Sequence, residues 1–350
     1  MVESSNSGAR AQFATWRTQL RHDFQRPSTP HAALRMLAWV VWWIALAVPL
    51  LRATAGFQDI AFPIVLGAGL GALLWVAPRN DLRTWVFYLT SLYFFTQLRD
   101  AADETAIGAS TSYVLNWETA WFNGTPTAWL QERVGGANGD TNFWSFAAAF
   151  VHWTWFVFPH AIVLGTFIFA RRMFFRVAVI MMATFYSAVV LYYLVPTVPP
   201  WLAMEMGETT GIRRVLTDVG PQILGQALFD DLFDLLAEPN PRAAMPSLHF
   251  AAGFIVIVLG YLVGSRKLML MASLYSTAMA FSLIYLGEHY FADILIGGAV
   301  AVAAAFIAET ALGNGPGLGI LGNLTHWPPG WRERLASIRR VKTRDAPGVR

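Results

Sequence analysis

Eight long apolar stretches restrict the possible fold more than any other feature of this chain. They cover residues 34–53, 60–78, 84–98, 144–170, 174–195, 248–265, 267–286 and 291–312. A helix that crosses a bilayer needs about 20 mostly apolar residues. The stretches lack the period-two alternation of barrel strands. Because a backbone inside a bilayer must satisfy its own hydrogen bonds, the pattern predicts membrane-spanning helices.

The composition supports a membrane protein. Hydrophobic residues make up 55% of the chain, charged residues 13%, and the mean hydropathy is +0.44, whereas a soluble domain carries about 25% charged residues. The absence of cysteine excludes disulfides and cysteine-ligated zinc. Residues 1–33 are polar and rich in arginine, without the apolar core of a signal peptide, so we expect an N-terminal tail. The predicted fold class is an all-α polytopic transmembrane bundle.

Lysine and arginine are unevenly divided among the connections. They gather in the N-terminal tail, in the C-terminal tail and in alternate short connections, at Arg79, Arg83, Arg171, Arg172, Arg176, Arg266 and Lys267. The connections 99–143 and 196–247 are longer and more acidic. Because cytoplasmic loops carry the excess of Lys and Arg, we expect eight spans of the cell membrane with both termini in the cytoplasm. Residues 223–236 read as an amphipathic helix in the second outer loop.

Two of the seven histidines stand at expected outer helix ends. His249 follows Pro246 and Ser247, and His289 lies four residues before Asp293. Proline suits the first turn of a helix, where free N–H groups and the helix dipole attract phosphate. A carboxylate four residues from a histidine on one helical face can fix the tautomer of its ring. The pattern predicts a nucleophilic imidazole, a second imidazole for proton transfer and amide donors, a set that suits phosphoryl transfer.

The other histidines lack such neighbours. His152 and His160 fall inside the fourth apolar stretch, where we expect them to be buried hydrogen-bonding residues. We expect His22, His31 and His326 to belong to the tails. Polar residues at membrane depth are functional by default, and only His249 and His289 combine that depth with suitable neighbours.

These two segments resemble the signatures of the type 2 phosphatidic acid phosphatase (PAP2) superfamily. Pro246-Ser247-Leu248-His249 is similar to the second signature of the family. The third signature is matched in type and spacing by Ser282, Tyr285, Leu286, Gly287, His289 and Asp293. The resemblance implies a six-helix catalytic core over residues 84–312, preceded by two additional helices over 34–83 and followed by a basic cytoplasmic tail over 313–350.

The resemblance also implies roles for the residues. His289 is the expected nucleophile that forms a phosphoenzyme, Asp293 orients it, and His249 serves as general acid and then as base. Ser247 is expected to help bind phosphate, as are Ser282 and Tyr285. No metal and no cofactor are expected.

The chain departs from the usual family pattern at positions that concern phosphate charge. Leu283 stands where an arginine usually follows the serine, Leu248 stands where glycine is common, and no outward-facing lysine begins a first signature. Arginines of the outer side must then meet the phosphate charge. The candidates are Arg99, Arg213, Arg214 and Arg242. Arg99 is ranked first because it ends a predicted span.

Pro-Ser-Leu-His and the segment 196–201 resemble the inositolphosphotransferase branch, which includes inositol phosphorylceramide synthase. We therefore expect a lipid phosphatase or phosphotransferase that acts on lipid-linked phosphate at the extracytoplasmic face, with an acceptor alcohol as a possible second substrate and no nucleic-acid partner. The alternative is a transporter or a non-catalytic membrane scaffold. The scarcity of ionisable residues within the stretches argues against a transporter.

Overall fold

The structure is a computed structural model, and it describes residues 2–25, 30–55, 61–103, 107–236 and 242–312. The predicted C-terminal tail, 313–350, lies outside the described residues. Apart from a single bridge between Thr197 and Ala243, the regular elements of the described part are helical. This confirms the all-α class predicted from the sequence.

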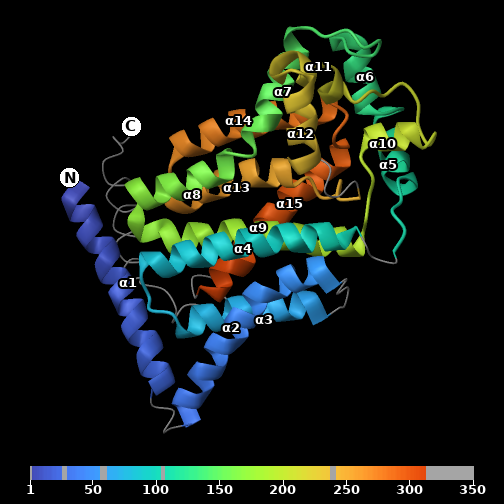
Figure 1. The fold of residues 1–350 in the computed structure, drawn as a ribbon. Helices are drawn as coiled ribbons and strands as arrows, with labels where there is room; N and C mark the ends of the chain where they lie inside the picture. The colour runs from blue at the N-terminus through green and yellow to red at the C-terminus, as the bar shows by residue number, and fades with distance from the viewer. Residues whose placement is uncertain (1, 26–29, 56–60, 104–106, 237–241, 313–350) are drawn as a thin grey trace, which may run out of the picture.

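The eight apolar stretches form the long helices of the bundle (Figure 1). These are α2 (Pro30–Ala55), α3 (Ala61–Val76), α4 (Asp81–Ala102), α7 (Phe143–Thr154) with α8 (Phe158–Phe169), α9 (Phe174–Leu194), α13 (Leu248–Val263), α14 (Arg266–Tyr285) and α15 (Phe291–Ala311). The fourth stretch is thus two helices that meet with a bend of 50°. The bundle is consistent with a protein of the membrane.

Length and hydropathy distinguish these helices from one another. Among the described residues, four segments are long and apolar enough to cross a membrane by themselves: Pro30–Pro49, Arg171–Leu194, Arg266–Tyr285 and Phe291–Ala311. The bent pair α7 and α8 passes the same test jointly, and α3 and α13 are apolar but shorter. The predicted number of eight spans therefore stays a prediction.

The centre of the bundle is built around α13 and α9. Helix α13 packs against α14, α15 and α9, and α9 also packs against α4 and α15. Helices α2 and α3 pack on each other, and α3 reaches the remainder through α4. This arrangement agrees with two additional helices beside a larger core, although the boundaries of that division stay a prediction.

Short capping motifs stand at the starts and ends of the long helices. Asn142 and Ser145 form a capping box at the start of α7, and the side chain of Ser265 accepts a hydrogen bond from Leu268 N (3.3 Å) at the start of α14. Gly264, with φ +72°, ends α13 in the left-handed conformation. Such caps satisfy N–H and C=O groups that a helix leaves free at its ends.

The first helix was not expected. Residues 2–25, predicted as a polar tail, form α1 (Val2–Gln25). The buried carboxylate of Asp23 fixes this helix to α2, because it accepts hydrogen bonds from Arg35 (3.0 Å) and from Trp39 Nε1 (3.0 Å). In Figure 1, α1 crosses one end of the bundle.

The two acidic connections fold into short helices at the other end of the bundle (Figure 1). They are α5 (Ser112–Phe122), α6 (Pro126–Val134), α10 (Pro200–Glu205), α11 (Val215–Leu224) and α12 (Gln226–Leu236). The predicted helix 223–236 is interrupted at Gly225, whose φ is +80°. Helix α12 then folds back so that Phe229 lies against Gly220 of α11.

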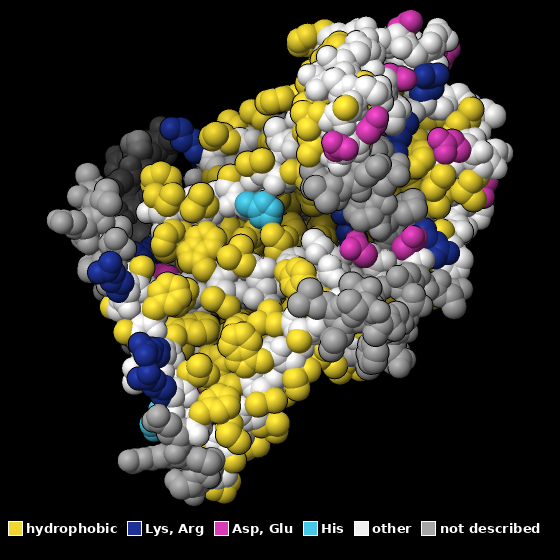
Figure 2. Space-filling model, in the orientation of Figure 1, with side chains coloured by type: hydrophobic (Ala, Val, Ile, Leu, Met, Phe, Trp, Pro, Cys, Tyr) yellow, Lys and Arg dark blue, Asp and Glu magenta, His cyan; other side chains and the backbone are white. Residues whose placement is uncertain are grey.

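Apolar and charged side chains occupy different parts of the surface between the α1 end and the far end of the bundle. Figure 2 shows apolar side chains over the middle of the visible face, Lys and Arg along the edge next to α1, and most of the visible Asp and Glu at the far end. At that far end Trp117, Trp121 and Trp129 are exposed. Exposed tryptophans of this kind suit the boundary between lipid and water.

Candidate active site

The segment before α13 is held in place by backbone pairing. Thr197 N donates to Arg242 O (2.9 Å) and Ala244 N donates to Thr197 O (3.0 Å). Helix α13 begins only at Leu248, with Ser247 as its N-cap. The expectation that Pro246 occupies the first turn is therefore wrong by two positions, because the hydroxyl of Ser247 accepts from Phe250 N (3.3 Å) and so begins the helix there.

The starts of α13 and α15 are joined at Ser247. Ser247 N donates to Asp293 O (3.0 Å), and Gly297 of α15 faces the backbone of Ser247. A Cβ atom at Gly297 would lie 2.5 Å from Ser247 O, so glycine is needed for this approach. The contact brings the turn that carries His249 next to the turn that carries Asp293.

Asp293 holds both its own helix and the neighbouring histidine. One carboxylate oxygen, Oδ2, accepts from Tyr290 N (2.9 Å), which caps α15, and lies 3.2 Å from His289 Nδ1. His289 is therefore just outside the helix rather than on it, although the four-residue contact with Asp293 forms as predicted. Asp293 is fully buried and His289 is 5% exposed.

His249 and His289 meet across the site. His289 Nε2 lies 3.3 Å from His249 Nδ1. When Asp293 is ionised, its carboxylate oxygen can only accept a hydrogen bond. His289 therefore carries its proton on Nδ1, and Nε2 of His289 bears a lone pair. In the neutral ring that lone pair accepts from His249 Nδ1–H. In this arrangement the lone pair of His289 Nε2 faces His249.

A third imidazole and an indole enclose His249. The ring of His152 stacks on that of His249 with centroids 4.8 Å apart and 25° between planes. Trp155 lies 4.5 Å from the same ring. Sequence reasoning missed His152, since it looked like any histidine in an apolar helix. His160, by contrast, is the hydrogen-bonding residue that was expected, because its Nδ1 lies 2.7 Å from Tyr88 OH.

Two other candidate residues, Ser282 and Tyr285, join α14 to α7. Ser282 donates to Ala148 O, and the hydroxyls of Tyr285 and Ser145 lie 2.8 Å apart. Both Ser282 and Tyr285 are fully buried. Their contacts hold α14, which carries the first residues of the third signature, against α7.

The candidate arginines differ in their surroundings. Arg99 lies in the last turn of α4, within electrostatic range of His249. Arg242 donates to Asp103 O (2.6 Å) in the segment after α4. Arg213 pairs with Asp218 (3.0 Å). Arg99 therefore lies near enough to His249 to act on an anion at the histidine pair.

The outer helices hold the loop that precedes His289. Trp201 N donates to Gly287 O (3.1 Å) and Val215 N donates to Leu286 O (3.2 Å). Gly287 has φ +80°, and a Cβ atom there would lie 2.6 Å from Arg213 O. Next to it, Glu288 pairs with the fourth candidate arginine, Arg214 (2.9 Å). The position of the loop therefore depends on contacts with the connection 196–247.

Glu118 of α5 is a second buried carboxylate near the start of α15. Its Oε1 accepts from Phe291 N (2.6 Å), and the side chain is fully buried. Burial raises the pKa of Glu118, the hydrogen bond from Phe291 opposes the shift and the nearby Asp293 adds to it, so that the pKa is about 7. Sequence reasoning did not identify this residue, because α5 and α15 are far apart in the chain.

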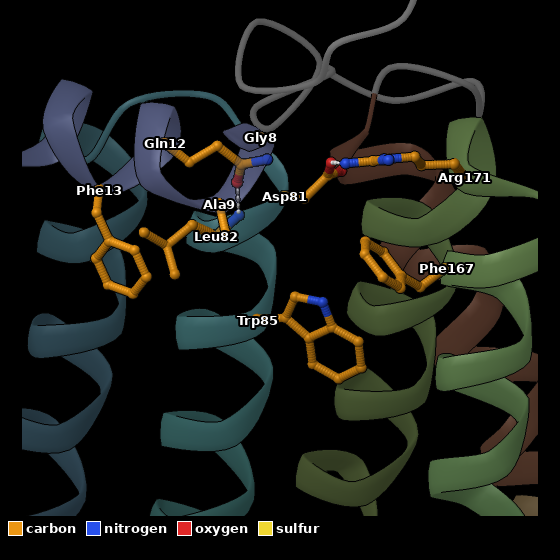
Figure 3. A pocket seen from close by; sticks show the side chains of 9 residues that line it. All are labelled: Gly8, Ala9, Gln12, Phe13, Asp81, Leu82, Trp85, Phe167 and Arg171. Atoms are coloured by element: carbon orange, nitrogen blue, oxygen red, sulfur yellow. Dashed lines mark hydrogen bonds and ion pairs between the residues drawn. The ribbon is translucent and has the colours of Figure 1, made fainter. Parts of the chain in front are cut away.

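A cavity of about 350 Å³ lies elsewhere, next to α1 (Figure 3). It is lined by Gly8, Ala9, Gln12, Phe13, Asp81, Leu82, Trp85, Phe167 and Arg171. Gln12 accepts from Leu82 N (2.8 Å), and Arg171 Nε donates to Asp81 (2.7 Å) at its edge. The cavity is formed by the start of α4, whereas Arg99 ends that helix, so it is separate from the histidine pair.

The fold and the histidine pair define a helical membrane protein with a site suited to phosphoryl transfer. Comparison with known sequences agrees: the profile of the PAP2 superfamily matches residues 114–308. The chain therefore belongs to the PAP2 superfamily, and it is an enzyme of the phosphatase and phosphotransferase class.

One relative points to a branch of the superfamily. The phosphoinositol dihydroceramide synthase of Bacteroides thetaiotaomicron is 30% identical over 133 residues, which cover 35% of this chain and 41% of that protein. The match thus spans about two fifths of the relative. It agrees with the inositolphosphotransferase-like branch that the sequence resembles. No solved structure gives a significant match.

Proposed function

We propose that this protein transfers the phosphate group of a membrane lipid through a phosphohistidine at His289. The observation that carries the proposal is the row Asp293, His289 and His249, with 3.2 Å between Asp293 and His289 Nδ1 and 3.3 Å between His289 Nε2 and His249 Nδ1. Such a row is the orienting arrangement of an activated nucleophile with a proton-transfer partner.

The chemistry follows in two steps. The lone pair of His289 Nε2 attacks phosphorus, the bond between phosphorus and the leaving oxygen breaks, and the cationic form of His249 gives that oxygen a proton and becomes neutral. Water or an acceptor alcohol then loses its proton to His249 and attacks the phosphohistidine, which breaks the bond between nitrogen and phosphorus. His289 is thereby restored, and Asp293 stabilises its cationic form.

The hydrogen bond between the two histidines must open for the first step. Reacting atoms need to approach to about 3–3.5 Å in line, and His249 Nδ1 occupies that position at 3.3 Å. The phosphate group of the substrate takes the place of His249 in front of Nε2. In this proposal the displaced imidazole remains beside the phosphate, where it can protonate the leaving oxygen.

Phosphate binding is assigned to Ser247 and Arg99. Ser247 begins α13, whose first N–H groups and dipole favour an anion, and Arg99 lies within electrostatic range of His249. For Ser282 and Tyr285, also candidates from the sequence, we propose support of α14 through α7. For Arg242 we propose that its hydrogen bond to Asp103 O holds the segment before α13 against the end of α4.

We further propose eight spans, cytoplasmic termini and an extracytoplasmic site. The distribution of Lys and Arg supports this topology, as does the position of the acidic short helices at one end of the bundle, which Figure 1 shows. On this topology the core 84–312 presents His249 and His289 to the outer leaflet, where lipid-linked phosphate can enter between helices.

The branch resemblance suggests a phosphoinositol lipid as donor and a lipid alcohol as acceptor. The test uses purified full-length protein in mixed micelles with a phosphatidylinositol donor, with and without a ceramide acceptor. A transferase forms an inositol-phosphate-bearing ceramide, and a hydrolase releases a water-soluble phosphate in the absence of acceptor. If the variants His249→Ala and His289→Ala retain the turnover of the wild type, the proposal is wrong and the scaffold alternative gains support.

A further inference from the structure

His152 is an unused imidazole in the middle of the site. It lies in the last turn of α7, is 4% exposed, and stacks on His249. Its Nδ1 atom is buried without a hydrogen-bond partner among the described residues. The two ring planes differ by only 25° and the ring centroids are 4.8 Å apart, so the ring that carries Nδ1 lies against one face of the His249 ring.

A buried polar atom without a partner is unfavourable. The lost hydrogen bond weakens an equilibrium by roughly tenfold to a hundredfold, and most such atoms in native structures are paired. This holds whether Nδ1 carries a proton or a lone pair. A partner that arrives with the substrate removes the cost, and an unpaired group at a reaction site is an expected preparation for that partner.

Under the proposed function, the partner that arrives at this site is the phosphate group of the substrate. Arg214, which lies within electrostatic range of His152, is paired with Glu288 (2.9 Å) and lies over the ring of Trp201 at 3.8 Å. The only lysines of the chain are Lys267 and Lys342, both on the predicted cytoplasmic side. Arg99 is the arginine already assigned to phosphate, and an imidazole suits a further phosphate contact because it donates and can also take up a proton when an anion binds.

We propose that His152 binds the substrate, with Nδ1 donating a hydrogen bond to a non-bridging oxygen of the phosphate group that His289 attacks. The inference rests on the proposed function and adds a phosphate-binding residue that neither signature contains. A lipid phosphodiester and inorganic phosphate share these oxygens, so both serve as probes.

The test compares the wild type with His152→Phe and His152→Asn as full-length protein in detergent. Phenylalanine retains the stacked ring without nitrogen, and asparagine retains an amide near the position of Nδ1. The matched control is His160→Phe on α8, which loses only the contact with Tyr88 (2.7 Å). The measurements are the affinity for inorganic phosphate and the kcat and KM for the lipid donor.

We expect His152→Phe to weaken phosphate affinity and to raise the KM of the donor by about tenfold or more. The kcat should change less than about threefold, because a hydrogen bond present in both ground and transition states acts on KM. His152→Asn should recover part of the loss, and His160→Phe should behave as wild type. In the wild type, added phosphate should shift the nitrogen NMR signal of His152 Nδ1.

Two results overturn the inference. The first is a His152→Phe protein whose phosphate affinity and KM equal those of the wild type, together with no shift of the His152 signal when phosphate is added to the wild type. The other is a greater loss in His152→Asn than in His152→Phe, which assigns the role to ring stacking alone. A failure of the proposed function is seen separately, as the absence of a phosphoenzyme at His289 in the wild type.

Discussion

The exchange Asp293→Asn tests how much the carboxylate contributes to the nucleophile. Asp293 Oδ2 accepts from Tyr290 N (2.9 Å) and from His289 Nδ1 (3.2 Å). Because both contacts fall on Oδ2, an asparagine that places its carbonyl oxygen there keeps the cap at Tyr290 and still accepts from His289 Nδ1. The exchange then removes the negative charge that stabilises the cationic form of the His289 ring.

The magnitude follows from the lost charge. An opposite charge within hydrogen-bond distance favours the charged form of a side chain by about 1–3 pKa units. Asp293 is fully buried beside His289, so we expect a loss of kcat of about 10- to 10³-fold. Because the cap of α15 is kept, stability should change by about 1 kcal/mol or less.

The assay is single-turnover release of the leaving alcohol from the lipid donor, with thermal unfolding of the same preparations as a control. Asp293→Ala serves as the second variant, because it removes the cap as well and should lower both rate and stability. An Asp293→Asn protein that unfolds like the wild type and retains kcat within about threefold would refute the role of the carboxylate charge.

Three further predictions follow from other contacts. Ionisation of Glu118, whose folded-state pKa of about 7 lies above the ordinary 4.5, opposes folding, so stability should fall as pH rises from about 4.5 to about 7. Glu118→Gln should flatten this fall in denaturant titrations, and an unchanged pH dependence would contradict the assignment. Breaking the buried pair of Arg176 and Glu309 (2.5 Å) by Glu309→Gln should destabilise the protein by about 3–5 kcal/mol, and Arg176→Met together with Glu309→Met should recover much of it in the same unfolding assay. His249→Ala should slow turnover about 10²- to 10⁴-fold for a donor with an alkoxide leaving group but less for a nitrophenyl phosphate, whose leaving group needs no proton; equal losses would argue against the acid role.

The sequence predicted the long helices and the histidine pair because both depend on local information. A stretch such as 291–312 must be helical in an apolar setting, and the spacing of His289 and Asp293 specifies their contact. The signatures also placed Ser247 beside His249. These features need no knowledge of which distant segments meet.

The features that were missed depend on tertiary contacts. His152 becomes part of the site only because α7 packs against α14 and brings its last turn to α13. Glu118 lies in an outer helix whose contact with Phe291 N has no signal in the sequence. The start of α13 at Leu248 is set by the hydroxyl of Ser247, which accepts a hydrogen bond from Phe250 N.

The most direct test of the account is to trap the covalent intermediate. Purified protein is mixed with donor lipid carrying labelled phosphate, quenched in alkali and digested, and the labelled peptide is identified by mass spectrometry. The account predicts an acid-labile phosphate on His289 that is absent from His289→Ala and accumulates when the acceptor is omitted. Turnover of the donor without any phosphohistidine, or label that persists in His289→Ala, would contradict it.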